Sequence, residues 1–346
     1  MKMPRIVSLF SGAGGLDLGF LEAGFEIAFA VDQMQAAIET HRHNFPSTTS
    51  IKADVTVRKQ ESGQLAILDE IAKVLDDGEP IGIIGGPPCQ GFSRANPNSH
   101  ADDPRNKMPT FYLEIVEALQ ARYEVQFVLF ENVMGIRDAK HSVTFNGILT
   151  RFKELMLTAG VAEHSALDYG VPQTRNRVII SGFKSEVAAK SFEPKTTPRD
   201  EVDLTVRGAI GSLPQPAFFK RGLSADEIQP HPNHWTMTPR SKRFMGEVNS
   251  PTPTRSFRRL SWDKPSPTVA YGHREIHVHP DGTRRLSIYE AMLLQGFPDT
   301  FILEGTLSEQ VEQVSNAVPP PMARSFAAAT RVALTTAATV DLVTAG

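Results

Sequence analysis

The first half of the chain alternates short apolar runs with stretches in which apolar residues recur at helical spacing. The short runs predict buried strands, and the stretches between them predict amphipathic helices. Strands separated by helices predict an α/β fold, with a mostly parallel sheet and helices on both faces. The expected strands are 5–10, 25–31, 81–84, 125–130 and 177–182, with one more before Asp54, and the expected helices are 16–23, 35–43, 108–120, 145–159, 287–294 and 322–334.

The pattern changes near residue 184. For about a hundred residues the sequence is rich in Pro, Ser, Thr, Arg and His and shows little periodicity, so loops should dominate there. Helical spacing returns toward the C-terminus. The expected domains are a large one over residues 1–183 completed by 305–346, a smaller irregular one over 184–285, and a connecting segment over 286–304.

Composition is that of an ordinary globular protein, with 40% hydrophobic and 22% charged residues in a chain of 346. No apolar stretch approaches the ~20 residues of a membrane span. The N-terminus does not have the pattern of a secretory signal, because glycines follow its short apolar run at once. We therefore expect a cytoplasmic protein with no membrane partner.

The charges are unevenly distributed along the chain. The net charge of −3 argues mildly against a nucleic-acid partner. Residues 184–285 nevertheless contain 17 Lys and Arg against 11 Asp and Glu, whereas the rest of the chain contains 19 against 28. Such an asymmetry fits a basic segment that meets a polyanion, and by itself it fits a solvated surface equally well.

The single cysteine excludes an intramolecular disulfide and a zinc site built from cysteines. A lone cysteine is usually a small core residue, but Cys89 lies in the segment GGPPCQGFS, after an expected buried strand rather than within it. Its loop begins at the C-terminal end of that strand, where ligands bind in open α/β sheets. Because prolines and glycines also form ordinary turns, the loop alone only suggests a functional thiol.

A second loop with functional character follows the first expected strand. In SLFSGAGGLDLGF, Gly12, Gly14 and Gly15 let the backbone turn sharply and approach a ligand closely. Asp32 and Asp54 follow the second and third expected strands, where an acid can accept ribose hydroxyls or simply cap a helix. The glycine spacing is not GxGxxG, so these residues favour a nucleoside-bearing cofactor without identifying it.

More polar groups are expected at the same edge of the sheet. Glu131 lies in FENV at the end of the next strand, where a carboxyl group in a dry pocket can donate a hydrogen bond to a heterocycle nitrogen. In VPQTRNRVII, Gln173, Arg175 and Arg177 should alternate onto one face of a strand. Three long polar side chains on one face are typical of a surface, or of a site that binds phosphate and a carbonyl oxygen.

Taken in order, these segments resemble those of the cytosine carbon-5 DNA methyltransferases, in particular the bacterial type II modification methylases. The proline-cysteine loop followed by ENV and QxRxR is a specific combination. The resemblance implies DNA (cytosine-5-)-methyltransferase activity, in a Rossmann-like S-adenosylmethionine-dependent methyltransferase domain with a smaller, irregular target-recognition domain. The matching blocks are SLFSGAGGLDLGF, Asp32, KADV, GGPPCQGFS, ENV, QTRNR, RRLSIYEAMLLQGFP and VSNAVPPPMARSFA.

The resemblance also implies roles for individual residues. Cys89 would add to carbon 6 of a flipped-out cytosine, which makes carbon 5 able to take the methyl group. Glu131 would contact the ring nitrogen and exocyclic amine, Arg177 would hold the carbonyl oxygen, and Arg175 would be a further catalytic residue. S-adenosyl-L-methionine would be the cofactor and S-adenosyl-L-homocysteine its product, with no metal. The implied cofactor-binding residues are Phe10, Gly12, Gly14, Leu16, Asp32, Asp54, Val55, Pro88 and Asn316.

Two positions depart from the family's pattern. After Asp32 the family often has an apolar residue and then an acid, whereas this chain has Gln-Met, which puts the packing of the adenine pocket in doubt. Ser315 precedes Asn316 where glycine is usual, which can alter that turn. Neither departure affects the loop of Cys89.

The irregular basic segment occupies the position of the family's target-recognition region, which gives its positive excess a role in DNA binding. Its histidines could suggest a metal site, but no acid or cysteine completes a convincing set, and no metal is expected. The expected DNA-binding residues are Gln90, Ser93, Arg240, Arg243, Arg258 and Arg259.

The expected partner is double-stranded DNA, bound by a monomer within a restriction-modification system whose endonuclease is not a stable partner. Three alternatives remain open: a transfer-RNA cytosine methyltransferase of the same fold, a non-catalytic DNA-binding protein, and a nicotinamide-dependent oxidoreductase. The basic segment and the residues after Cys89 favour DNA over RNA. The presence of Cys89, Glu131 and Arg177 argues against a binding protein, and the missing GxGxxG argues against the oxidoreductase.

Overall fold

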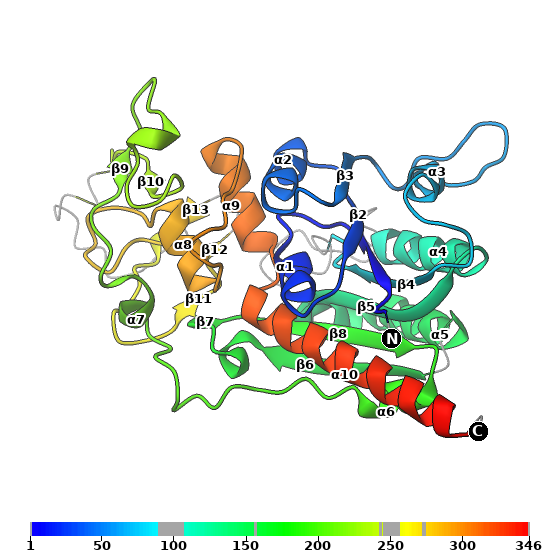
Figure 1. Ribbon diagram of the computed structural model, residues 1–346. Coiled ribbons are helices and arrows are strands. Elements are labelled where there is room, and N and C mark those ends of the chain that lie inside the picture. Colours follow the sequence, from blue (N-terminus) through cyan, green and yellow to red (C-terminus); the bar gives the residue numbers. More distant parts are fainter. Residues whose placement is uncertain are drawn as a thin grey trace. The chain divides into compact units, whose positions relative to one another are not determined.

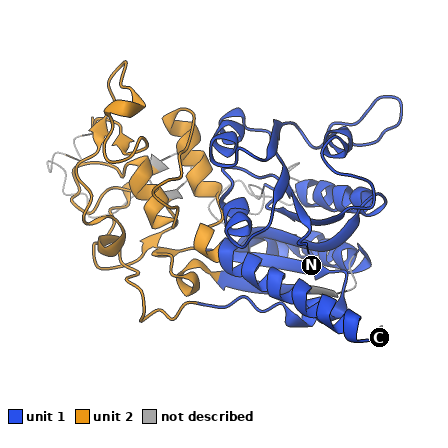
Figure 2. Cartoon of the chain, viewed as in Figure 1, with its two compact units in different colours: residues 1–164, 176–196, 323–346 blue, residues 165–175, 197–322 orange. Residues whose placement is uncertain are grey.

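The computed structural model describes residues 2–88, 107–155, 158–241, 244, 257–271 and 275–344. By the contacts within the chain, it divides into two compact units (Figure 2). Unit 1 comprises Met1–His164, Asn176–Thr196 and Ala323–Gly346, and unit 2 comprises Ser165–Arg175 and Thr197–Met322. The domain boundaries expected from the sequence stay a prediction.

Unit 1 is built on a seven-stranded sheet in the order β3-β2-β1-β4-β5-β8-β6 (Figure 1). Strands β3 to β5 run parallel, and β8 is antiparallel to β5. β2 and β4 each bury five of their six residues, as strands covered on both faces should. The predicted mostly parallel sheet is therefore confirmed. The strands are β1 Arg5–Leu9, β2 Ile27–Asp32, β3 Thr49–Lys52, β4 Pro80–Gly85, β5 Glu124–Val133, β6 Thr158–Ser165 and β8 Asn176–Phe183.

Helices cover both faces of this sheet. On one face, Val7 and Phe130 belong to a hydrophobic core that includes residues of α3, α4 and α5. On the other face, Phe127 stacks on Phe20 of α1 with ring centroids 5.8 Å apart. Gly82 makes room for that ring, because a Cβ there would lie 2.3 Å from it. The helices are α1 Gly15–Glu22, α2 Gln35–Asn44, α3 Ile67–Ala72, α4 Met108–Gln120, α5 Ser142–Leu155, α6 Glu186–Ser191 and α10 Pro320–Thr344.

The long helix α10 (Figure 1) belongs to unit 1 from Ala323 on, and there it buries a stripe of mostly apolar side chains. Gly19 of α1 approaches it so closely that a Cβ would lie 2.4 Å from the carbonyl carbon of Ala323. Within the described ranges, α10 is the one helix long and apolar enough to cross a bilayer, a test that core helices also pass. The length of α10 therefore departs from the expectation that no apolar stretch approaches the length of a membrane span. The spacing of its buried positions is nevertheless that of a core helix. Those positions include Met322, Ala323, Phe326, Ala327, Ala329, Thr330, Ala333, Leu334 and Ala337.

Unit 2 has little regular structure, as its Pro-rich and weakly periodic sequence predicts. Among the residues that the structure describes, its strands are two residues long and pair in three separate two-stranded sheets. The helices are α7 Val206–Ile210, α8 Ile288–Leu294 and α9 Leu307–Asn316. The strand pairs are β7 Gln173–Thr174 with β11 Ser266–Pro267, β9 Ala217–Phe218 with β10 Trp235–Thr236, and β12 Ala270–Tyr271 with β13 Glu275–Ile276.

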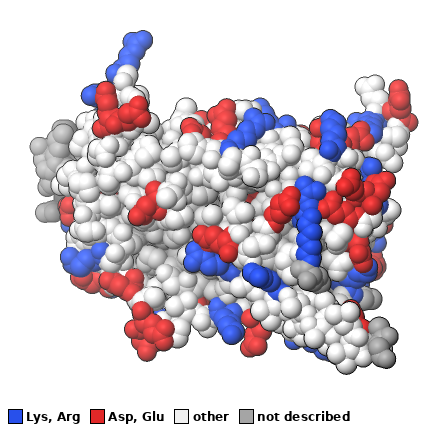
Figure 3. All heavy atoms as spheres, viewed as in Figure 1, with Lys and Arg blue, Asp and Glu red and all other residues white. Residues whose placement is uncertain are grey.

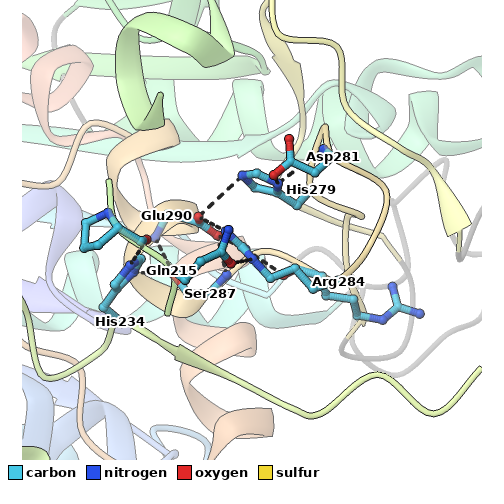
Figure 4. Close-up of polar contacts among 9 residues, drawn as sticks. Gln215, His234, His279, Asp281, Arg284, Ser287 and Glu290 are labelled. Atoms are coloured by element: carbon cyan, nitrogen blue, oxygen red, sulfur yellow. Dashed lines mark hydrogen bonds and ion pairs between the residues drawn. The ribbon is translucent and has the colours of Figure 1, made fainter. Parts of the chain in front are cut away.

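A buried polar network holds unit 2 together (Figure 4). The Arg284 guanidinium donates to both carboxylate oxygens of Glu290 at 2.8 Å, and these side chains are 3% and 1% exposed. Glu290 also accepts from the Ser287 amide, which completes a capping box at the start of α8. Ser287 Oγ in turn lies 2.9 Å from Nδ1 of His234. The network therefore adds directional contacts to a unit that also buries apolar side chains such as Val278, Ile288 and Met292.

Buried histidines of unit 2 predict a loss of stability at acid pH. Burial lowers the pKa of His231, His234, His277 and His279 below the usual value. Below about pH 6.5 the unfolded chain therefore binds more protons than the folded one, and the free energy of unfolding falls with pH. Both tryptophans of the chain lie in unit 2, so their fluorescence reports its unfolding.

We expect a lower urea midpoint at about pH 5.5 than at about pH 7.5. Replacing His277 by Gln should reduce that difference, since Nε2 of His277 lies 2.6 Å from the Thr268 carbonyl oxygen in a site that disfavours the imidazolium. Equal midpoints at the two pH values would contradict the prediction.

The expected elements are present with shifted bounds, of which the largest shift is at α10, expected to end at residue 334 but ending at Thr344, and one element was wrong. A single helix was expected over 145–159, but α5 ends at Leu155 and β6 begins at Thr158. Over so few residues the apolar positions fit either the helical or the strand period, and only pairing in the sheet decides. The short helices α3, α6 and α7, and helix α9, were not predicted.

Candidate active site

The carboxyl ends of neighbouring strands in unit 1 bring the expected groups to one edge of the sheet. β1 leads into the glycine turn, β2 ends at Asp32, and β4 leads into Gly86 and the two prolines before Cys89. Glu131 lies near the C-terminal end of β5. Because β1, β2, β4 and β5 are parallel neighbours, these ends meet at the same edge.

The glycine turn has a backbone that only a few residue types adopt. Phe10, Gly12 and Gly14 have φ values of 55°, 54° and 87°, in the left-handed region. The Ser11 amide donates to the Val31 carbonyl of β2 at 3.0 Å, which anchors the turn to the sheet. A Cβ at Gly12 would have no atom within 4 Å, so the turn leaves open space for a ligand on that side.

Asp32 is tied to the glycine turn. Its Oδ2 accepts from the Gly12 amide at 3.0 Å, and Oδ1 accepts from the Met34 amide at 2.8 Å. Burial raises the pKa of the Asp32 carboxyl, and hydrogen bonds from backbone amides partly offset this. Each oxygen keeps a lone pair free for a further donor, which suits two vicinal ribose hydroxyls.

The segment after β3 lies beside Asp32, since the Ala53 amide donates to the Asp32 carbonyl at 3.1 Å. Val55 is buried, whereas Asp54 is exposed and accepts from the amide and hydroxyl of Thr56 at 2.9 and 2.7 Å. Leu16 is buried in the first turn of α1. The sheet therefore brings the expected residues of β1, β2 and β3 together in one unit.

Glu131 and Arg177 form an ion pair, with Nε of Arg177 2.7 Å from Oε1 of Glu131. The antiparallel pairing of β5 with β8 produces this contact, because Arg177 lies opposite Val133, two positions along from Glu131. The two side chains are 11% and 10% exposed, so the pair is largely withdrawn from water yet still reachable. The guanidinium compensates the charge of the buried carboxylate, and their contact is an ion pair without the geometry of a hydrogen bond.

The loop leading to Cys89 is held against the strand that carries Glu131. Asn132, which is buried, donates from Nδ2 to the Pro87 carbonyl at 3.3 Å. The Tyr112 hydroxyl donates to the Leu129 carbonyl at 3.0 Å, and its ring lies against Gly85. Sequence reasoning missed Asn132 and Tyr112 as supports, although Asn132 belongs to the ENV block itself. Cys89, Gln90, Ser93 and Arg243 lie outside the described residues.

Gly86 is required for the position of the Glu131 carboxylate. A Cβ at Gly86 would lie 2.7 Å from Oε2 of Glu131, closer than real Cβ atoms approach an oxygen. We expect Gly86→Ala to lower kcat about 10²-fold by displacing the carboxylate. Gly147→Ala is the matched control, because Gly147 is exposed in α5 with nothing within 4 Å of its Cβ position. Steady-state assays that find equal kcat for both variants would contradict the prediction.

The QxRxR segment does not form one strand, and its long side chains do not share one face. Gln173 lies in β7, and its Nε2 donates to Gln295 Oε1 at 2.7 Å. Arg177 lies in β8 of unit 1. Because the strand is interrupted at Arg175, the expected alternation over these residues was wrong.

Arg175 is 1% exposed, and its guanidinium binds backbone carbonyls at the end of α9. It donates to Ser315, Asn316 and Ala317 at 2.7, 3.1 and 2.8 Å. The last carbonyls of a helix lack partners within the helix and attract cations. This geometry favours a positioning role for Arg175 over the expected catalytic one. Asn316 is exposed at the end of α9 in unit 2, and its cofactor role stays a prediction.

The described arginines expected to bind DNA lie in unit 2. Arg240 and Arg258 are exposed, and Arg240 lines a cavity of about 180 Å³. Arg259 donates from Nε to the Pro280 carbonyl at 2.5 Å and lies over Gly282, so part of its guanidinium serves the loop itself. Lys and Arg are mixed with Asp and Glu over the face drawn in Figure 3.

The buried histidines of unit 2 bind protein oxygens. Nε2 of His231 lies 3.1 Å from the Phe301 carbonyl, and Nε2 of His234 lies 2.9 Å from the Pro214 carbonyl. Over the described ranges, no three His, Cys, Asp or Glu side chains gather as metal ligands would. In the described structure, these rings form hydrogen bonds with the irregular segments around them.

Comparison with known proteins identifies what the chain is similar to. Residues 4–331 match the family described as C-5 cytosine-specific DNA methylase. The chain is 33% identical to Type II methyltransferase M.MthTI of Methanothermobacter thermautotrophicus, over 93% of this chain and 95% of that protein. It is 30% identical to Type II methyltransferase M.NgoPII of Neisseria gonorrhoeae, over 95% and 96%. A prophage-encoded E. coli structure described as a DNA modification methyltransferase has a TM-score of 0.71 at 27% identity, over 96% of this chain and 100% of that one.

Proposed function

The chain belongs to the C-5 cytosine-specific DNA methylase family and is a DNA (cytosine-5-)-methyltransferase, and we propose that it acts through a covalent adduct of Cys89 with a flipped-out cytosine in double-stranded DNA. The Glu131–Arg177 pair carries this proposal. It lies beside the start of the loop that leads to Cys89, at the edge of the sheet that also holds the glycine turn. The carboxyl group can accept from the exocyclic amine of a cytosine, and the guanidinium can donate to its carbonyl oxygen.

The protein residues divide the chemistry between them. The Cys89 thiolate adds to carbon 6, and the electron density that this moves into the ring makes carbon 5 nucleophilic. The protonated Glu131 carboxyl donates to the ring nitrogen and accepts from the exocyclic amine, and Arg177 donates to the carbonyl oxygen, so charge that develops on the ring is stabilised. After methyl transfer, water takes the proton from carbon 5, the double bond between carbons 5 and 6 re-forms, and the thiolate leaves. A base inside a duplex cannot be reached this way, so the cytosine must leave the stack.

The cofactor residues fit S-adenosyl-L-methionine. The open space at Gly12 and the left-handed turn through Phe10 and Gly14 accept the methionine portion, with Leu16 beside it. Asp32 accepts the ribose hydroxyls. When bound, the cofactor supplies an electrophilic methyl group and leaves as S-adenosyl-L-homocysteine. Asp54 and Val55 are proposed for the adenine, and Pro88 and Asn316 for support of the pocket.

The biological setting is proposed from the family. Relatives carry the name of type II methyltransferases, which fits a modification enzyme of a restriction-modification system. We propose a cytoplasmic monomer that reads one duplex sequence through residues 184–285, without a stable endonuclease partner. Arg240 and Arg258 are the described candidates for contact with DNA, because both are exposed.

Covalent trapping tests the proposal. Duplex fragments that carry 5-fluorocytosine are incubated with the protein and S-adenosyl-L-methionine, because fluorine at carbon 5 prevents the final elimination and leaves the protein attached. We expect a denaturation-resistant complex with the native chain, and none with Cys89→Ser or with S-adenosyl-L-homocysteine in place of the cofactor. Sequencing the trapped DNA gives the target. A complex that persists with Cys89→Ser, or one that forms on RNA alone, would overturn the proposal.

A further inference from the structure

A buried histidine joins three elements behind the glycine turn. His41 of α2 and Asp17 of α1 are both 0% exposed, and Nε2 of His41 lies 3.3 Å from Oδ1 of Asp17. Nδ1 of His41 lies 2.8 Å from Oγ of Ser50 in β3. Because a carboxylate accepts and cannot donate, Nε2 carries a proton in this contact. The network therefore connects α1, α2 and β3 through one imidazole.

The same imidazole packs against Gly14 in the glycine turn. His41 stacks on Phe45 with ring centroids 4.2 Å apart. A Cβ at Gly14 would lie 2.5 Å from Cε2 of Phe45 and 3.1 Å from Cδ2 of His41. Gly14 thus rests directly on the two rings, and a shift of the His41 ring must move the turn.

Asp17 lies in the first turn of α1, where an acidic side chain commonly caps the N-terminus of its own helix. It is the third residue of α1 after the cap residue Gly14, and an acid there commonly bonds back to the cap. No side chain caps α1 in this way. The Asp17 carboxylate lies against His41 instead, and its Oδ2 has no hydrogen-bond partner among the described residues. A charge with so little solvent and so few partners depends on the imidazole.

We propose that His41, held by Asp17, is a positioning residue for the cofactor turn and sets the affinity for S-adenosyl-L-methionine. The pair fixes Gly14 and the first turn of α1, so that uncapped amides of that turn remain available to the carboxylate of the methionine portion. This inference rests on the proposed cofactor site. His41 and Asp17 lie outside that site, and they keep the turn in its left-handed conformation before the ligand binds.

Binding of S-adenosyl-L-homocysteine, measured by calorimetry on the full chain, tests the inference without an activity assay. His41→Phe keeps a ring on Phe45 but leaves Asp17 and Ser50 without the imidazole. We expect Kd to rise about tenfold or more, because a buried charged group loses its partner. His41→Gln keeps an N–H that can reach Asp17, and its Kd should stay within about threefold of the native value. His43→Gln, on the exposed side of the same helix, is the matched control.

The outcomes separate the inference from the proposed function. A native chain that binds no S-adenosyl-L-homocysteine would overturn the proposed cofactor site. Native binding with an unchanged Kd in His41→Phe would overturn the positioning role alone, and so would an equal loss in His43→Gln. If circular dichroism shows that His41→Phe does not fold, Asp17→Asn decides: a Kd raised at least about threefold supports the role, and an unchanged Kd overturns it. Affinity for duplex DNA without cofactor should be the same in all of these variants.

Discussion

Glu131→Gln is expected to lower kcat for methyl transfer about 10²- to 10³-fold, the loss that follows removal of one preorganised group aimed at developing charge. The carboxylate is held 2.7 Å from Arg177 and faces the loop that leads to Cys89. An amide of the same size keeps the packing and can still donate to the ring nitrogen and accept from the exocyclic amine, but it cannot transfer a proton to the ring as charge develops there. Binding of S-adenosyl-L-homocysteine should be unchanged, because the glycine turn and Asp32 are intact.

Single-turnover methylation of a duplex that contains the target provides the measurement, with trapping on 5-fluorocytosine DNA as a second readout. Glu124→Gln is the matched control, since Glu124 begins the same strand and forms an exposed ion pair with Lys184 at 2.5 Å. A rate within about tenfold of the native value would show that Glu131 is not needed in the transition state.

Glu290→Gln is expected to lower the free energy of unfolding of unit 2 by about 3–5 kcal/mol, because it leaves the Arg284 guanidinium buried without its counter-ion. Both side chains are almost wholly buried, and Glu290 also completes the capping box of α8. Two hydrogen bonds of the Arg284 guanidinium depend on this one carboxylate (Figure 4). Urea unfolding followed by tryptophan fluorescence reports the change, since both tryptophans lie in unit 2.

Two further variants sharpen this test. Glu227→Gln breaks an exposed pair with Lys220 in the same unit, and it should change the free energy of unfolding by no more than about 0.5 kcal/mol. The double variant Arg284→Met with Glu290→Leu removes both charges together, and it should recover part of the loss. A Glu290→Gln midpoint equal to that of Glu227→Gln would contradict the importance of the buried pair.

Local features of the sequence were sufficient for the parallel strands β1 to β5 and for the edge at which the site lies, but not for β6. Strands such as β2 and β4 are continuous apolar runs followed at once by functional residues, so one segment carries both the strand and the group that it presents. Asp32 could be placed after β2 in this way, and Glu131 near the end of β5. Parallel pairing of neighbours then brings these ends to one edge without further information.

Interactions between distant segments could not be predicted in that way. Arg175 has the same spacing in QxRxR as a site residue would, yet its guanidinium lies on the carbonyls of residues 315–317. Asp17 belongs to the glycine-rich block, and nothing in that block indicates His41 as its partner. Such contacts join residues that are far apart in sequence, and no local period encodes them.

The sequence by itself determined the α/β class, the order of the functional blocks and the family. Each of these depends on contiguous residues, and the blocks together form a specific combination. Only the tertiary structure determined which polar side chains pair with each other. It paired Glu131 with Arg177 across antiparallel strands, Arg284 with Glu290 in unit 2, and His41 with Asp17 behind the turn. The physical reason is that a buried charge must meet its partner in space, and the chain can supply that partner from any segment that packing brings near.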